Sequence, residues 1–270
     1  MDTSGERWTV SGPRVLELGG DDEPVREVKV QLVGGRADVV AHDDQVRVRV
    51  EVDGVHGHDV TVTWTDGVLE VGHPALRWDD LLEGLRHVRG GDRAEVSIAV
   101  PRAVAVRLGT VTADGLVSGT TEHAQVRTVS GTIVVDGVHA HVDARTVSGS
   151  IEVVDQHGSL TADSVSGSVT VQAVSLPELR GKSVSGSLAV DVATAPSTIG
   201  ATTVSGDVTV RIPAGSGFDL TAKLSGRVVA GGELLDGKPG KSGGRISSGD
   251  GAVQLVARTV SGDVTLLQQP

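Results

Sequence analysis

The histidines are the first candidates for chemistry, because paired imidazoles bind metals and transfer protons near neutral pH. The segment His56-Gly57-His58-Asp59 places two imidazoles and a carboxylate on a glycine-rich turn, and His139-Ala140-His141 forms a second pair. A zinc site needs a third ligand at a recognisable spacing, and the chain contains no cysteine and no HExxH sequence. We therefore interpret both pairs as solvent-exposed structural segments and expect no metal and no cofactor.

Serine is the second candidate, because it recurs in the tripeptide Val-Ser-Gly and could act as a nucleophile. A nucleophile is needed once, whereas this serine appears in block after block, and no copy lies in a G-x-S-x-G elbow. We predict an outward-facing row of hydroxyls instead. The row consists of Ser130, Ser148, Ser166, Ser185, Ser205, Ser225 and Ser261.

Paired carboxylates could cleave glycosidic bonds if the fold brought two of them together. Asp207 and Asp263 occupy the same place in their blocks, but about three blocks of sequence separate them. Sugar-binding grooves also use aromatic platforms, and the chain has only three Trp and one Phe. We expect no enzyme, and a polysaccharide-active β-helix enzyme is the third of three functional hypotheses.

One glycine-rich stretch resembles a nucleotide-binding loop. Residues 237–244 contain Gly-Lys-Ser, the last three positions of a P-loop, but Leu235 stands where the first glycine is required. The stretch is therefore interpreted as a flexible loop.

Composition excludes several classes of protein. The chain has 270 residues with a net charge of −11, which disfavours binding to nucleic acid. It contains 49 Val, a β-branched residue that favours strands. No run of about 18 apolar residues predicts a membrane span, and the first residues lack the pattern of a secretory signal. We expect a cytoplasmic protein with no membrane span.

An internal repeat dominates the second half of the chain. Successive blocks are 18 to 20 residues long, and each contains two short stretches of alternating apolar and polar residues. Two strands per block, with a bend between them, predict one coil of a β-solenoid stacked through parallel hydrogen bonds. The blocks begin at Val111, Val129, Val147, Val165, Val184, Val204, Leu224 and Val260.

The alternation also predicts which residues face inward. In the block that opens at Val147, that valine shares one face with Gly149, Ile151 and Val153. Glycine in this inner row is expected to let the opposite sheet approach or the strand bend. A narrow interior of small side chains explains the scarcity of aromatic residues.

The first hundred residues are also rich in strands, and they contain one expected helix. Apolar residues at helical spacing run through Pro74–Val88, with a glycine pair after its end. We expect residues 1–100 to form a β-rich capping region and residues 101–270 the solenoid, as one continuous domain. The helix is either a lid over the open end of the solenoid or a docking surface for a partner. Its candidate partner-binding residues are Trp78, Leu81, Leu82 and Leu85.

The repeated TVSG blocks over residues 96–267, led by Val-Ser-Ile-Ala-Val-Pro, resemble the bacterial β-strand-repeat "putative adhesin" family, also called the toastrack domain. Strand-like residues 28–52 look like the opening strands of that family. The resemblance implies an all-β solenoid that serves as an interaction or assembly surface. It also implies a link to the cell envelope or its stress responses, and it offers no catalytic residues.

Three functional hypotheses follow. The first is a non-enzymatic β-solenoid scaffold that binds protein partners and self-associates through the solenoid ends. The second is a surface adhesin exported without a recognisable signal. The third is the polysaccharide-active enzyme described above.

Overall fold

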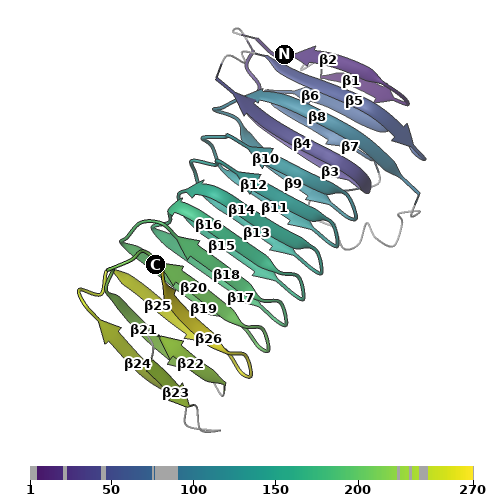
Figure 1. Ribbon diagram of the computed structural model, residues 1–270. Helices are drawn as coiled ribbons and strands as arrows, with labels where there is room; N and C mark the ends of the chain where they lie inside the picture. The colour runs from purple at the N-terminus through teal and green to yellow at the C-terminus, as the bar shows by residue number, and fades with distance from the viewer. Residues whose placement is uncertain are drawn as a thin grey trace. The chain divides into compact units, whose positions relative to one another are not determined.

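The computed structural model describes residues 5–20, 23–43, 47–74, 76, 91–223, 226–230, 233–236 and 243–269 (Figure 1). Every regular element among these residues is a β-strand, which confirms the all-β solenoid. The chain divides into two compact units, Met1–Ala140 and His141–Pro270. Apart from Pro74 and Leu76, the expected helix lies outside the described residues, and so do its four candidate partner-binding side chains.

The first unit contains two sheets whose strands alternate along the chain. One sheet has the order β1-β6-β7-β3-β9-β11 and the other β2-β5-β8-β4-β10-β12. The pairs β3–β9 and β4–β10 are parallel, whereas β1–β6 and β2–β5 are antiparallel. The strands are β1 (Glu6–Val10), β2 (Arg14–Leu18), β3 (Glu27–Leu32), β4 (Gly34–His42), β5 (Val48–His56), β6 (Val60–Thr65), β7 (Val68–Gly72), β8 (Arg93–Pro101), β9 (Ala105–Thr110), β10 (Asp114–Ser118), β11 (Ala124–Thr128) and β12 (Thr132–Asp136).

The second unit repeats the two-sheet arrangement with the orders β13-β15-β17-β19-β25-β21-β24 and β14-β16-β18-β20-β26-β22-β23. Its pairs are parallel except β21–β24 and β22–β23 at one end. The strands are β13 (Val142–Thr146), β14 (Ser150–His157), β15 (Leu160–Ser164), β16 (Val169–Ser175), β17 (Glu178–Ser183), β18 (Leu188–Val192), β19 (Ser197–Thr202), β20 (Val208–Ile212), β21 (Phe218–Lys223), β22 (Arg227–Ala230), β23 (Glu233–Asp236), β24 (Gly243–Ser248), β25 (Val253–Arg258) and β26 (Val264–Gln268).

The order of the last coils differs from their order in sequence. The blocks were expected to stack in turn, yet β25 lies between β19 and β21, and β26 lies between β20 and β22 (Figure 1). Strands β21 to β24 precede β25 and β26 in the sequence, yet they lie beyond them at the end of the two sheets. The two antiparallel pairs at that end mark where the chain reverses. Parallel pairing cannot be closed by a short hairpin, so a reversal of this kind needs antiparallel strands.

The valine that opens each regular block with Val-Ser-Gly, from Val129 onward, does not belong to the inner row, contrary to the expected pattern. Thr146 and Gly149 are both buried, whereas Val147 and Ser148 between them lie at a corner. The side chains of Val165 and Val184 are 48% and 49% exposed. The change of phase between the two strands of a coil therefore occurs across Val-Ser, because two residues are needed to turn from one sheet to the other.

Glycine in the inner row is required for a different reason from the one expected. A Cβ atom on Gly186 would overlap the carbonyl oxygen of Gly167, and one on Gly206 would overlap the carbonyl oxygen of Gly186. The close neighbour is therefore the backbone of the adjacent coil in the stack, not the opposite sheet. A side chain at this position would force neighbouring coils apart.

Candidate functional site

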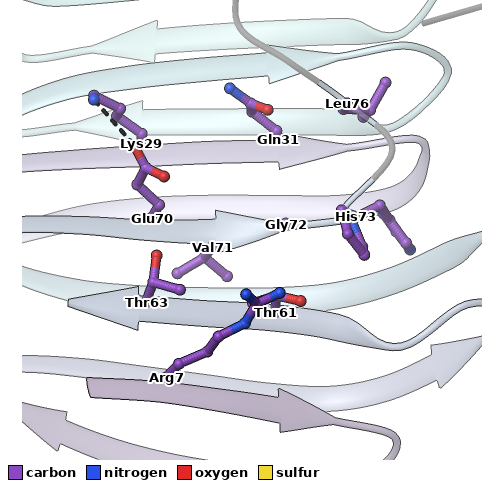
Figure 2. Close-up of a pocket in the computed structure, with 11 residues that line it drawn as sticks. Arg7, Lys29, Gln31, Thr61, Thr63, Glu70, Val71, Gly72, His73 and Leu76 are labelled. Atoms are coloured by element: carbon purple, nitrogen blue, oxygen red, sulfur yellow. Dashed lines mark hydrogen bonds and ion pairs between the residues drawn. The ribbon is translucent and has the colours of Figure 1, made fainter. Parts of the chain in front are cut away.

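The first unit carries a pocket on the outer face of the sheet that contains β1, β6, β7 and β3. The pocket has a volume of about 260 Å³. Period-two alternation turns every second side chain of each strand toward it, so residues far apart in sequence converge (Figure 2). Its lining residues are Arg7, Lys29, Gln31, Thr61, Thr63, Glu70, Val71, Gly72, His73, Pro74 and Leu76.

The charges in this pocket are not balanced. Lys29 Nζ lies 3.0 Å from Glu70 Oε1, an ion pair drawn as a dashed line in Figure 2, and 4.0 Å from Glu27 Oε2. Arg7 is exposed, and no acidic side chain in the described part of the chain pairs with it. The pocket therefore offers one available guanidinium beside the hydroxyls of Thr61 and Thr63. Such a set suits a carboxylate, because a guanidinium binds carboxylates through two parallel hydrogen bonds.

A cluster of titratable groups, with His73 and Asp92 buried and His58 exposed, lies next to this pocket. The main-chain N–H of His58 donates to Asp92 Oδ1 at 3.0 Å, and His58 Nδ1 lies 3.0 Å from each carboxylate oxygen. His73 is only 2% exposed, and its Nδ1 accepts a hydrogen bond from the main-chain N–H of Val33 at 3.3 Å. These hydrogen bonds anchor the chain at His73, directly after β7, and at Asp92, directly before β8.

The surroundings of the cluster shift two pKa values. Burial lowers the pKa of His73, although the charge of Asp92 partly opposes this. Burial acts to raise the pKa of Asp92, but the hydrogen bonds from His58 outweigh it, so the pKa lies below its usual range. The expected charge states near neutral pH are thus a neutral His73 and an ionised Asp92. No sequence signal links His58 to Asp92, because 34 residues separate them.

One histidine of each pair, His58 and His141, has a side-chain partner. His58 contacts Asp92 as described, and His141 Nδ1 lies 2.7 Å from Ser159 Oγ in the adjacent coil. Within the described residues, no group of three or more His, Asp or Glu side chains is arranged to hold a metal ion.

Six of the seven repeated serines are exposed in the outward row that the sequence predicted, and the seventh, Ser225, lies outside the described residues. Ser166 Oγ donates to the carbonyl of Val147 at 3.1 Å, and Ser185 Oγ donates to the carbonyl of Val165 at 3.3 Å. Ser130, Ser205 and Ser261 make the same bond to the preceding coil in the stack. These hydroxyls therefore hold neighbouring coils together at the corner.

A second hydroxyl in each corner was missed by sequence reasoning. In the regular blocks a Thr or Ser precedes Val-Ser-Gly, buried in Thr128, Thr146, Ser164, Thr203 and Thr259 and half-buried in Ser183, and its hydroxyl bonds the glycine three residues later. Thr203 Oγ1 donates to the carbonyl of Gly206 at 2.7 Å, and the N–H of Gly262 donates to Thr259 Oγ1 at 2.9 Å. The recurrence of Thr or Ser directly before Val-Ser-Gly is the sequence signal that could have predicted this hydrogen bond.

The two aspartates that seemed too distant to meet lie in adjacent coils. The N–H of Asp263 donates to Asp207 Oδ1 at 2.9 Å. Asp263 itself accepts a backbone hydrogen bond from Arg227 at 2.9 Å and pairs with its guanidinium at 2.8 Å. These bonds, the backbone one first, lower the pKa of Asp263. That carboxylate is therefore a poor general acid, because it holds its proton weakly.

No helix among the described residues is long and apolar enough to cross a membrane.

Comparisons with known proteins identify the architecture. The family model described as Toastrack DUF4097 matches residues 40–267. A solved structure of a "putative lipid binding protein" from Parabacteroides distasonis ATCC 8503 is 10% identical, with 96% of this chain and 97% of that chain covered and a TM-score of 0.50. A "putative adhesin" from Bacteroides fragilis NCTC 9343 is also 10% identical, with 94% and 97% covered and a TM-score of 0.50. No curated protein matches the chain significantly. At these identities the likeness to the solved structures extends to the fold alone.

Proposed function

Because the chain belongs to the Toastrack DUF4097 family, we propose that it is a non-enzymatic β-solenoid scaffold that binds protein partners. The regular coils support this function, since they display fixed rows of side chains on long, flat faces. The outward serines are engaged in bonds between coils, which suits a structural role better than catalysis.

The choice of binding site rests on an unpaired arginine that lines a pocket, which is true of Arg7 and not of Arg14. Arg7 is exposed on β1 without an acidic partner in the described part of the chain, whereas Arg36, Arg49 and Arg180 each pair with an acid two residues away. A partner segment that carries Asp or Glu would supply the missing charge. Thr61 and Thr63 would provide hydroxyls for its main chain or polar side chains.

Pro74 and Leu76 line the pocket, and the four expected partner-binding residues follow them in the sequence, outside the described residues. We place the apolar part of the partner contact on Trp78, Leu81, Leu82 and Leu85. An acidic, partly apolar protein segment would match the combined surface.

Exchanging the charge of Arg7 tests the site. Immobilised wild-type protein, Arg7→Glu and Arg14→Glu are compared for partner capture from native lysate. Arg14 is the matched control, because it is exposed on β2 in the other sheet of the same unit and its pairing partners are likewise absent among the described residues. Capture that is lost in Arg7→Glu and kept in Arg14→Glu supports the proposal. Equal capture by all three contradicts it.

The proposed location is the cytoplasm, and the alternative function is a surface adhesin. The Bacteroides protein named above carries the adhesin description, which is the reason to retain this alternative. Cell fractionation separates the two: a soluble pool supports the scaffold, and enrichment in the envelope supports the adhesin.

Self-association through the solenoid ends is also proposed. The strands β1 and β2 each have one hydrogen-bonded neighbour within the described residues, and so do β23 and β24. Unpaired strand edges are templates for pairing with another chain.

A further inference from the structure

One side of the pocket that contains Arg7 is built on a buried histidine. His73, Pro74 and Leu76 line the pocket, and we call these three residues the histidine wall. His73 is only 2% exposed, and its Nδ1 accepts a hydrogen bond from the main-chain N–H of Val33 at 3.3 Å. Because that N–H is a donor, Nδ1 must be unprotonated, and the neutral ring carries its proton on Nε2. Nε2 is buried and has no hydrogen-bond partner in the described part of the structure.

Val33 also supports the far end of the histidine wall (Figure 2 labels His73 and Leu76). The main-chain N–H of Leu76 donates to the carbonyl of His73 at 3.1 Å, and the buried Leu76 side chain packs against Val33 and Val111. The carbonyl of Val33 accepts two hydrogen bonds from Thr112, one from its main-chain N–H at 2.7 Å and one from its Oγ1 at 3.0 Å. Thr112 therefore holds Val33 in the stack, whereas the histidine wall depends on the bond between Val33 and His73.

The charged groups that face His73 come from two other segments. Asp92, directly before β8, is 6% exposed, and His58 Nδ1 lies 3.0 Å from each of its carboxylate oxygens. The charge of Asp92 favours a proton on His73, whereas the charge of His58 opposes it. Burial outweighs the attraction to Asp92, so the pKa of His73 is lowered while the ring stays in this place. The other charged residues that line the pocket are Arg7, Lys29 and Glu70.

Protonation of His73 is incompatible with the bond that holds its ring. A proton on Nδ1 would face the N–H of Val33, so that two donors would meet, and the imidazolium must turn away. The main-chain N–H of His73 donates to the carbonyl of Gln31 at 3.0 Å, and this bond does not involve the ring. The change is therefore confined to the His73 side chain and to the packing of Pro74 and Leu76 after it.

We propose that the histidine wall is an acid-sensitive switch, which weakens partner binding at the pocket as the pH falls from 7 to 5. This inference rests on the proposed function, because it concerns the regulation of the same site. A displaced ring regains the ordinary pKa of 6.5, so the displaced state binds the proton more tightly and gains population in acid. The partner segment then loses its contacts with Pro74 and Leu76 on that side of the pocket.

Amide hydrogen exchange of the full chain, followed by NMR, tests the switch without any partner. The protection factor of the Val33 amide, corrected for the intrinsic effect of pH, is expected to fall about tenfold or more between pH 7 and pH 5. The Thr112 amide should stay protected, because its bond to Val33 does not involve His73. In His73→Asn the Val33 amide should be equally protected at both pH values. Unchanged protection in the wild type, or an equal fall in His73→Asn, overturns the proposal.

His58→Gln separates the effects of the two histidines. The main-chain bond from residue 58 to Asp92 remains in this variant, while the side chain can no longer titrate. The fall in protection at Val33 should therefore persist. Its disappearance would assign the pH dependence to His58 and overturn the role of His73.

A fluorescent hexa-aspartate peptide connects the switch to the pocket. Its affinity for the wild type, measured by anisotropy, should fall about fivefold or more between pH 7 and pH 5. Its affinity for His73→Asn should fall less, and an equal fall in both proteins overturns the regulatory role. A peptide that does not bind the wild type at pH 7 contradicts the acidic partner of the proposed function, while the exchange of the Val33 amide still decides whether the switch exists.

Discussion

The main-chain nitrogen of Asp263 donates a 2.9 Å hydrogen bond to Oδ1 of Asp207, although the two residues are 56 positions apart. The contact exists because the last coil lies between two coils whose strands come before it in the sequence. The C-terminal strands β25 and β26 are therefore internal to their sheets.

Removing the last coil should disrupt the second unit and not merely shorten it. A chain that ends at Ala252 lacks β25 and β26, which leaves β21 and β22 without their parallel partners. We expect loss of cooperative unfolding, measured by circular dichroism, and rapid proteolysis after residue 200. A chain that lacks only the last two residues is the control. Native-like spectra and protease resistance in the truncated chain would contradict the inserted order.

Gly186→Ala should strongly destabilise the fold, because its Cβ would overlap the carbonyl oxygen of Gly167. We expect a loss of about 3 kcal/mol in the free energy of unfolding, the upper range for overpacking. Gly200→Ala is the matched control, since its Cβ would meet nothing closer than the carbonyl oxygen of Leu179 at 3.7 Å. Urea unfolding of both variants measures the difference, and equal stabilities would argue against close contact between the coils.

Thr203→Val tests the buried hydroxyl of the corner. The substitution keeps the side-chain shape but leaves the carbonyl of Gly206 without its 2.7 Å hydrogen bond. A buried carbonyl that loses its donor costs about 1–3 kcal/mol. Thr209→Val, at a partly exposed position on β20, should change stability by less than about 0.5 kcal/mol. Chemical denaturation measures the free energy of unfolding of both variants. An unchanged value for Thr203→Val would show that the corner hydrogen bond does not stabilise the fold.

Stability should fall as the pH is lowered from 7 to 5. The pKa of His73 is lowered in the folded state, so the unfolded chain binds more protons around its ordinary value of 6.5. The facing groups are His58 and Asp92. The lowered pKa of Asp92 adds a further loss in stronger acid, where that carboxylate becomes protonated.

His73→Asn isolates this effect, because the amide oxygen can still accept the hydrogen bond from Val33 while the side chain cannot titrate. Thermal unfolding of the variant should depend less on pH between 7 and 5 than that of the wild type. His42→Gln, at an exposed histidine, is the control. An unchanged pH dependence in His73→Asn would show that His73 is not the responsible group.

Most of the fold could be predicted from the repeat, because the 18- to 20-residue period and the alternation report directly on stacking and on the two faces of a strand. The exposure of Val184 could not be predicted, since valine two residues before a buried glycine is compatible with both a strand and a corner. The inserted position of the last coil could not be predicted either, because blocks that share one motif do not reveal the order in which they stack. Within the site, Arg7 and Glu70 were missed, since their proximity depends on how β1, β6, β7 and β3 are ordered in the sheet.

The most direct test of the scaffold function compares partner capture by wild-type protein, Arg7→Glu and Arg14→Glu, quantified by mass spectrometry. The account predicts that the same proteins are enriched by wild type and Arg14→Glu and are lost with Arg7→Glu. Retention of those proteins by Arg7→Glu, or no enrichment by the wild type over bare resin, would contradict it.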